Sequence, residues 1–221
     1  MNDTSPALPR TLGETITQEI RRMLVEGELV PGQRLSEAAL AENLDISRNT
    51  LREAFRVLTR EGLLKHEPNR GVTVAVPDMG SIIDIYRVRR FIECTALAQG
   101  YPQHPGAVHM REAVESGVRA REAQDWIAVG TANMKFHKSI VELADSPRLV
   151  VFYGQISAEL RLAFGLLNDP KFLHLPYLDM NASILQCLEE GKAGEATAML
   201  ESYLVQSERT VLAAYERSLK R

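Results

Sequence analysis

The sequence predicts a mostly α-helical protein in two parts, in which β-structure is confined to one short hairpin. Apolar residues recur at helical spacing along most of the 221 residues. Two short strand-like segments, 63–67 and 72–76, flank the turn sequence PNRG at residues 68–71. Beyond this hairpin the chain has no strand-like alternation of apolar and polar residues. We therefore expect an N-terminal domain over residues 1–77 and an all-α domain over residues 78–221.

Three helices are expected ahead of the hairpin. The first covers residues 12–26 and ends at Gly27. A serine precedes each of the next two, 37–44 and 48–61, and its hydroxyl can cap the free backbone N–H groups at the helix start. A short turn at residues 45–46 joins them. Two helices that meet at a short turn and are followed by a hairpin have the order of a winged helix-turn-helix, a module that inserts a helix into the DNA major groove.

The third expected helix has an apolar face and a polar face. Apolar residues follow the i, i+3, i+4, i+7 pattern of a helix packed on a core, at Leu51, Ala54, Phe55 and Leu58. The opposite face carries Asn49, Arg52, Glu53, Arg56 and Arg60, and the first turn is flanked by Arg48 and Thr50. Arginine can donate two hydrogen bonds to guanine, and asparagine can bond adenine. A charged helix face is more often merely solvated, but a neighbouring hairpin with Arg70 at its tip favours a DNA-reading surface.

Residues 31–75 (PGQRLSEAALAENLDISRNTLREAFRVLTREGLLKHEPNRGVTVA) closely resemble the DNA-binding domain of the GntR family of bacterial transcription regulators. The resemblance implies that the third helix is the recognition helix and that its first turns contact DNA, here through Arg48, Thr50 and Arg52. Asn49 stands where many relatives carry threonine, and we include it among the expected DNA contacts. The resemblance implies further contacts from the tip of the hairpin, the wing, at Asn69, Arg70 and Gly71.

Composition and charge narrow the class of protein. The net charge is −3, but residues 46–72 hold six cations and three anions, a local charge of +3 that suits contact with phosphates. No apolar run approaches the length of a membrane-spanning helix, and the first ten residues contain no apolar signal segment. Both cysteines lie in helical, apolar surroundings rather than in a disulfide framework. A cytoplasmic protein without membrane contact is therefore expected.

The second domain is expected to be an antiparallel helical bundle, with residues 77–78 as the linker before it. Clusters rich in proline, glycine, asparagine and aspartate divide residues 79–219 into helical segments. The six expected helices are 79–99, 107–124, 126–143, 147–167, 177–190 and 193–219. Such helices pack as an antiparallel bundle, and the core of a bundle is a common ligand site.

Three segments of this domain resemble the FadR-type C-terminal ligand-binding domain of the same family, in its subgroup with a six-helix bundle, the FCD domain. They are IYRVRRFIE, NMKFHKSIVELADSPRL and MNASILQCLEEGKAGEATAMLESYL. Many members of this subgroup hold a divalent metal through one aspartate and three histidines. The matching positions here are Asn133, His137, Asn181 and Tyr203. Because the carboxylate and two imidazoles are missing, most of the donors that Zn²⁺ prefers are lost. We expect no metal and no other cofactor.

Two other interpretations of these four positions stay open. His137 can be an ordinary core histidine that a neighbour satisfies. Alternatively, the four side chains line a polar pocket and bond an organic effector directly, since amide, imidazole and phenol groups can donate as well as accept. The second is favoured, because four polar residues at matched positions do not look scattered.

Arg89 lies at the family's RxxxE position together with Glu93. It can capture an effector carboxylate through two parallel hydrogen bonds, or it can form an i,i+4 ion pair within its own helix. The sequence favours neither over the other. The expected effector contacts are therefore Arg89, Asn133, His137, Asn181 and Tyr203, and Arg161 has less support.

These features together predict a ligand-responsive transcription regulator. One recognition helix reads only a few base pairs, so we expect a homodimer on a palindromic operator in double-stranded DNA. The effector is expected to be a small organic molecule, a carboxylate by resemblance, and the action to be repression, as in most relatives. The alternative is a metal-dependent enzyme or metal sensor built on the helical domain. The sequence shows no nucleophile–base pair and no glycine-rich phosphate loop, which argues against catalysis.

Overall fold

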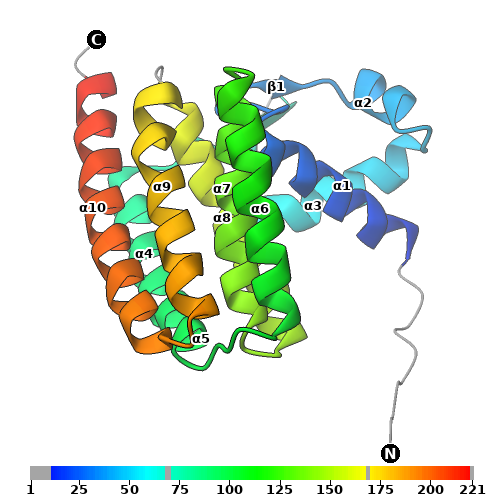
Figure 1. The fold of residues 1–221 in the computed structure, drawn as a ribbon. Coiled ribbons are helices and arrows are strands. Elements are labelled where there is room, and N and C mark those ends of the chain that lie inside the picture. The colour runs from blue at the N-terminus through cyan, green and yellow to red at the C-terminus, as the bar shows by residue number, and fades with distance from the viewer. Residues whose placement is uncertain (1–10, 68–70, 168–169, 220–221) are drawn as a thin grey trace, which may run out of the picture.

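A computed structural model describes residues 11–67, 71–167 and 170–219. Within these ranges the chain is mostly helical, as predicted, and its strands form one small sheet in the N-terminal part. Figure 1 shows the N-terminal elements beside a bundle of long helices. None of the helices in the described ranges is both long and apolar enough to cross a bilayer.

The N-terminal helices begin and end close to the predicted positions. They are α1 (Leu12–Glu26), α2 (Glu37–Asn43) and α3 (Arg48–Arg60). Each begins after a hydroxyl side chain that accepts a hydrogen bond from a backbone N–H three residues later, at Thr11, Ser36 and Ser47. At the end of α1, Gly27 has a φ of 78°, the left-handed conformation that glycine adopts without a steric penalty.

The sheet contains one strand that the sequence pattern did not predict. The hairpin strands β2 (Leu64–Glu67) and β3 (Gly71–Val74) pair antiparallel, and β1 (Arg34–Leu35) pairs with the other edge of β3. The strand order is β1-β3-β2. A two-residue strand is too short to show the alternation by which strands are recognised.

The bundle differs from the predicted helices at two places. The first predicted helix, 79–99, is α4 (Met79–Arg89), a π-helical turn η1 (Arg90–Cys94) and α5 (Thr95–Ala98). The predicted helix 177–190 begins earlier, at Pro170, and runs through Pro176 as α9 (Pro170–Glu189). The remaining helices are α6 (Pro105–Glu122), α7 (Trp126–Glu142), α8 (Pro147–Gly165) and α10 (Ala193–Leu219).

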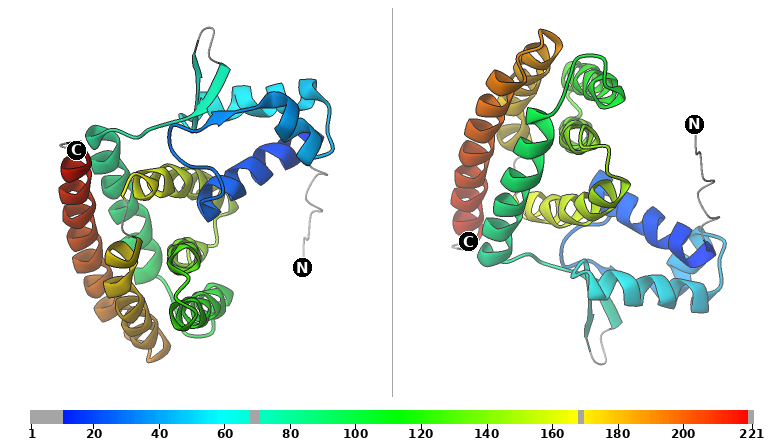
Figure 2. Two further views of the ribbon diagram at one scale, coloured as in Figure 1. Left: turned by 90° about the horizontal axis from the view of Figure 1, so that it is seen from above. Right: turned by 90° about the horizontal axis from the view of Figure 1, so that it is seen from below.

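The long helix α8 contributes to two hydrophobic cores. One core fills the bundle, and Phe164 of α8 belongs to it. The other lies among α1, α2, α3 and the sheet, and it includes Ala158 and Leu162 of α8. Figure 2 shows the C-terminal end of α1 beside this helix, and the two helices are in contact. The N-terminal core is therefore completed by a bundle helix.

Candidate nucleic-acid interface and candidate effector site

The first turn of α3 presents most of the expected DNA contacts to solvent. Arg48, Asn49 and Arg52 are exposed, and Thr50 is half-buried. The hydroxyl of Ser47 accepts a hydrogen bond from the Thr50 amide at 3.1 Å, and the two hydroxyl oxygens lie 2.9 Å apart. The start of a helix favours a phosphate through its free N–H groups and its dipole, so this end of α3 suits a DNA backbone as well as base edges.

Two arginines of this surface are paired with carboxylates. Arg52 Nε donates to Glu37 Oε2 at 2.8 Å, which links α3 to α2, and Arg56 pairs with Glu53 within α3. Both side chains keep more than half of their area exposed, 55% for Arg52 and 71% for Arg56. Exposed pairs of this kind contribute at most about 1 kcal/mol. A DNA strand can therefore draw both arginines away from their carboxylates at little cost.

A groove of about 730 Å³ separates this helix face from the wing, and its lining includes Arg52, Arg60 and His66. Gly71 opens β3 with a φ of 85°, a conformation available to glycine without strain. The other two expected wing contacts, Asn69 and Arg70, lie outside the described residues. DNA contact by the seven expected residues stays a prediction.

The five expected effector contacts come together in the bundle core, although they belong to four different helices. Arg89, His137, Asn181 and Tyr203 are at most 2% exposed, and Asn133 is 9% exposed. They form two hydrogen-bonded groups. The groups meet where the ring of His137 packs against the ring of Tyr203, with 4.8 Å between the ring centroids.

The first group is centred on Glu93, which lies in the π-helical turn. Its carboxylate accepts hydrogen bonds at 2.6 Å from Arg89 Nε, from the Tyr153 hydroxyl and from His137 Nδ1. The i,i+4 ion pair between Arg89 and Glu93 is therefore formed. A π-helical turn interrupts a regular helix with an i→i+5 bond and is frequent at functional sites.

Charge balance sets the protonation states of this group. Burial by itself would raise the pKa of Glu93, but Arg89 and His137 hold that pKa below its usual range, so Glu93 is a carboxylate. Burial lowers the pKa of His137. Because Arg89 and Glu93 already neutralise each other, a charged imidazole would be an unpaired ion in the core. His137 is therefore neutral and donates from Nδ1 to Glu93, which leaves its Nε2 as an acceptor.

The second group is centred on Asn133. Its Oδ1 accepts from Asn181 Nδ2 at 2.7 Å and from the Tyr203 hydroxyl at 3.1 Å. Among the described residues of these two groups, two buried acceptors have no hydrogen-bond partner: His137 Nε2 and Asn181 Oδ1. An unsatisfied buried acceptor costs about 1–3 kcal/mol, and such groups in folded proteins are usually met by water or a ligand.

These two groups do not fit a divalent metal. The atom at the family's aspartate position, Asn133 Oδ1, is uncharged and already accepts two hydrogen bonds. The carboxylate of Glu93 is compensated by Arg89. Across the described ranges, no cluster of three or more His, Cys, Asp or Glu side chains could hold a metal.

The sequence pattern gave no sign of three residues of this core. Tyr153 of α8 donates to Glu93, and the Tyr86 hydroxyl lies 2.7 Å from the Ser207 hydroxyl, with both side chains buried. The guanidinium of Arg89 lies over the ring of Tyr86, 5.1 Å from its centroid. The apolar pattern of a helix assigns such a tyrosine to the hydrophobic core. It does not show which polar atom the hydroxyl will bond.

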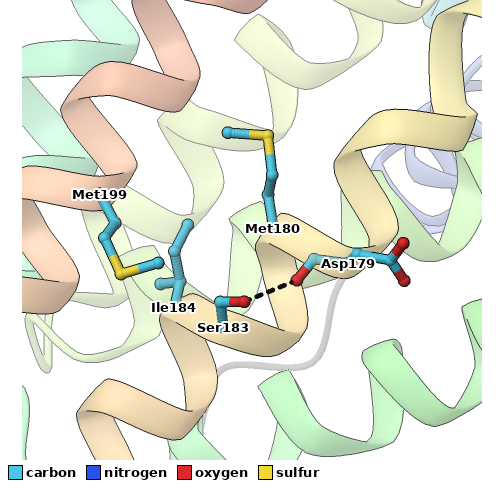
Figure 3. A pocket seen from close by; sticks show the side chains of 5 residues that line it. All are labelled: Asp179, Met180, Ser183, Ile184 and Met199. Carbon is cyan, nitrogen blue, oxygen red and sulfur yellow. Dashed lines mark hydrogen bonds between the residues drawn. The ribbon is translucent and has the colours of Figure 1, made fainter.

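A separate pocket of about 200 Å³ lies between α9 and α10 (Figure 3). Met180, Ile184 and Met199 form its apolar wall. The Ser183 hydroxyl beside them is occupied, because it donates to the backbone carbonyl of Asp179 at 3.0 Å. None of the expected effector contacts lines this pocket, and few polar groups are left there to orient a ligand.

Two family models match the chain. Residues 12–74 match the model described as bacterial regulatory proteins of the gntR family, and residues 84–206 match the FCD domain. The HTH-type transcriptional regulator YdhC of Bacillus subtilis is 24% identical over 134 residues, which are 59% of this chain and 60% of that relative. The chain thus spans less than two thirds of this relative.

Two further proteins match more of the chain. The probable D-xylose utilization operon transcriptional repressor of Paenarthrobacter nicotinovorans is 27% identical over 192 residues, which are 81% of this chain and 83% of that relative. A crystal structure of a transcriptional regulator GntR from Rhodococcus sp. RHA1 is 34% identical and superposes with a TM-score of 0.85, covering 92% of this chain and 98% of the other.

Proposed function

Because the chain belongs to the gntR family of bacterial regulatory proteins and carries an FCD domain, we propose that it is a ligand-responsive transcription regulator that binds DNA. The relatives that match it are named as transcription regulators, not enzymes, which confirms the expectation of a non-enzymatic role. In this proposal residues 1–77 bind DNA, and residues 78–221 bind the effector and form the homodimer. The protein acts in the cytoplasm, as a repressor.

The observation that carries the proposal is the exposed start of α3, where Arg48, Asn49 and Arg52 stand on a capped helix end. Arg52 also lines the groove that His66 of the wing borders. One such helix discriminates only a few base pairs, so a dimer on a palindrome is the expected mode of binding. Asn69, Arg70 and Gly71 of the wing, together with Thr50, complete the proposed contact set.

Selection of bound duplexes from a random DNA library tests this mode directly. We expect the enriched sites to share an inverted repeat, with the two half-sites about one helical turn apart or closer. The matched control is Arg119→Ala, which removes an exposed arginine from α6 and should not alter the enriched sequence. A failure to enrich any sequence, or enrichment of a site without two-fold symmetry, would contradict the proposal.

The proposed effector is a small organic molecule with a carboxylate or similar polar head, bound among Arg89, Asn133, His137, Asn181 and Tyr203. A carboxylate would compete with Glu93 for the guanidinium of Arg89. The unpartnered acceptors His137 Nε2 and Asn181 Oδ1 need hydrogen-bond donors. A hydroxycarboxylate supplies both kinds of group, since its hydroxyl can donate while its carboxylate accepts.

The effector site can be separated from the DNA-binding surface with one double variant. Tyr203→Phe combined with His137→Ala removes two of the proposed contacts and leaves α3 and the wing intact. Operator release is measured by gel shift against a panel of small hydroxycarboxylates, including lactate, malate and gluconate. We expect the double variant to lose the response to an active compound while operator affinity stays within about threefold, less than 1 kcal/mol. Release at the wild-type effector concentration would place the sensing site elsewhere.

A further inference from the structure

Arg161 of α8 is a buried cation without a carboxylate partner in the described part of the chain. It is 7% exposed. Among the described residues its one hydrogen bond runs from Nη2 to the backbone carbonyl of Ile127, at 3.4 Å. A guanidinium has five N–H donors, so most of its donors are unused. Burial lowers the pKa of Arg161, whereas Glu93 compensates the similarly buried Arg89.

The end of α1 lies directly against this guanidinium. A Cβ atom on Gly27 would come within 2.9 Å of Arg161 Nη2, so a glycine is what allows the close approach. The two carboxylates that flank Gly27, Glu26 and Glu28, are both paired with Arg22. The helix end itself offers only a partial negative charge, equivalent to about half an elementary charge. Arg161 therefore lacks a full counter-charge from this segment.

A pocket of about 150 Å³ opens beside Arg161, between the chain that follows α1 and the helices α7 and α8. Its other walls are mainly apolar and include Leu29, Pro31, Trp126, Ile127 and Phe164. A second cation stands next to one wall, because Lys171 Nζ lies 5.5 Å from the centroid of the Trp126 ring. The pocket thus combines apolar walls with an uncompensated guanidinium and a nearby ammonium.

We propose that this pocket binds a small organic carboxylate with an apolar body. The planar guanidinium of Arg161 can donate two parallel hydrogen bonds to one carboxylate, and the apolar walls would cover the rest of the molecule. The site is separate from the bundle-core residues proposed above as effector contacts. Its lining comes from the chain that follows α1 and from α7 and α8, so its occupant would touch both the N-terminal part and the bundle.

The competing explanation is that Arg161 only braces the end of α1 against α7. In that case the guanidinium would support the fold and no ligand would be needed. The two explanations differ in stability as well as in binding. If Arg161 supports the fold, Arg161→Met should be less stable than the wild type. If Arg161 is an uncompensated buried cation, the same variant should be at least as stable, because burying a lone charge is costly.

The single tryptophan of the chain, Trp126, lines the pocket and reports on its occupancy. The probes are benzoate, the uncharged isostere benzamide, and acetate, which lacks the apolar body. We expect a saturable change in tryptophan fluorescence with benzoate at a Kd of about 1 mM or tighter, and no saturable change with benzamide or acetate in the same range. No DNA is present, so a negative result here leaves the DNA-binding proposal standing.

Variants assign the signal to Arg161. Arg161→Met should weaken benzoate binding by about tenfold or more, the effect of losing a charge-assisted hydrogen-bond pair, without lowering the melting temperature. Arg148→Met, which removes an exposed arginine from the same helix, should bind benzoate like the wild type. A second variant, Arg161→Lys, keeps the positive charge but lacks the planar guanidinium that donates two parallel hydrogen bonds. It should bind benzoate more weakly than the wild type yet still in preference to benzamide.

Four results of the experiments with wild type and Arg161→Met would overturn the proposal. They are no saturable benzoate signal in the wild type, equal binding of benzoate and benzamide, wild-type affinity in Arg161→Met, and a melting temperature of Arg161→Met several degrees below that of the wild type. Asp169 lies outside the described residues. The variant Asp169→Asn tests whether its carboxylate is the partner of Arg161. A gain in benzoate affinity of more than about tenfold, or 1.4 kcal/mol, would show that Asp169 already occupies Arg161, which would also overturn the proposal.

Discussion

The sharpest test of the bundle core is Glu93→Gln, which removes one charge and keeps the shape of the side chain. Glu93 is fully buried and accepts three hydrogen bonds at 2.6 Å, and Arg89 beside it is 2% exposed. The variant leaves the buried Arg89 guanidinium without its counter-charge. Breaking a buried ion pair from one side costs about 3–5 kcal/mol, a large share of the roughly 5–15 kcal/mol that holds a domain folded.

The free energy of unfolding is measured by urea titration at one fixed protein concentration, because the apparent stability of the proposed dimer would depend on concentration. The control is Glu115→Gln, whose partner Arg119 is also four residues away. That pair has 3.9 Å between its charged atoms and more than half of each side chain exposed, so the expected loss is within about 0.5 kcal/mol.

A second substitution shows whether the loss of stability in Glu93→Gln comes from the unpaired Arg89 guanidinium. Adding Arg89→Met to Glu93→Gln removes the unpaired charge and should recover a large part of the stability, since an apolar replacement of a buried ion pair is often neutral. The two side chains are in contact, so their effects should be strongly non-additive. A loss below about 1 kcal/mol in Glu93→Gln, or additive losses in the double variant, would refute the assignment of Glu93 as the compensating charge of this core.

Three further outcomes are expected. Arg48→Ala and Arg52→Ala should each weaken specific operator binding by about 1–3 kcal/mol in gel-shift titrations, whereas Arg70→Ala should weaken binding evenly across DNA sequences; unchanged affinity in both helix variants would rule out α3 as the reading helix. A chelator should change neither the melting temperature nor operator release; a drop of several degrees that Zn²⁺ reverses would show that the core does coordinate a metal. The free energy of unfolding should fall as the pH drops below about 6.5, the ordinary histidine pKa. The folded-state pKa of His137 is lowered, so at such pH the unfolded chain binds a proton that the buried ring does not. His137→Gln should flatten the dependence of this free energy on pH between pH 7.5 and 5.5, and an equally steep dependence in that variant would assign the slope to other groups.

Short sequence patterns were sufficient to predict helix starts that a capping side chain marks. Ser36 and Ser47 mark the starts of α2 and α3, because a hydroxyl cap needs only the next three residues to act. The early start of α9 had a competing signal. Pro176 reads as a helix breaker, yet Tyr177 and Leu178 after it are buried in the bundle, and packing of this kind offsets the one hydrogen bond that proline removes.

The candidate effector site was predictable only in part. Alignment with the family's metal positions brought Asn133, His137, Asn181 and Tyr203 together as an expected site, and these side chains lie next to one another in the structure. Their binding of an effector stays a prediction. The other hydrogen-bonded residues of this core could not be predicted from the family alignment. The hydrogen bond between Tyr153 and Glu93 joins residues 60 positions apart, and the π-helical turn around Glu93 leaves no mark in the apolar periodicity. Which buried acceptor a hydroxyl reaches depends on how helices pack, and short-range patterns do not contain that information.

Helix α8 supplies a physical connection between the bundle core and the recognition helix. Tyr153 of α8 donates to Glu93 at 2.6 Å, in the core where the effector contacts meet. Two residues further on, Gln155 donates to Glu61 at 3.2 Å, and Glu61 caps the C-terminal end of α3. Glu61 is also paired with Arg21 of α1 at 2.6 Å. One helix therefore holds the candidate sensing group on one side and the end of α3 on the other.

This connection bears on how an effector could act on DNA. The proposed carboxylate competes for Arg89, so its binding would rearrange the hydrogen bonds of Glu93 and with them the position of Tyr153. Because α8 also contributes Ala158 and Leu162 to the N-terminal core, it cannot shift without moving α1 and α3. An effector alters operator affinity only if it favours one such arrangement over another. Residues 75–78, between β3 and α4, join the two parts covalently. The packed contacts of α8 with the N-terminal core hold the two parts in one relative position.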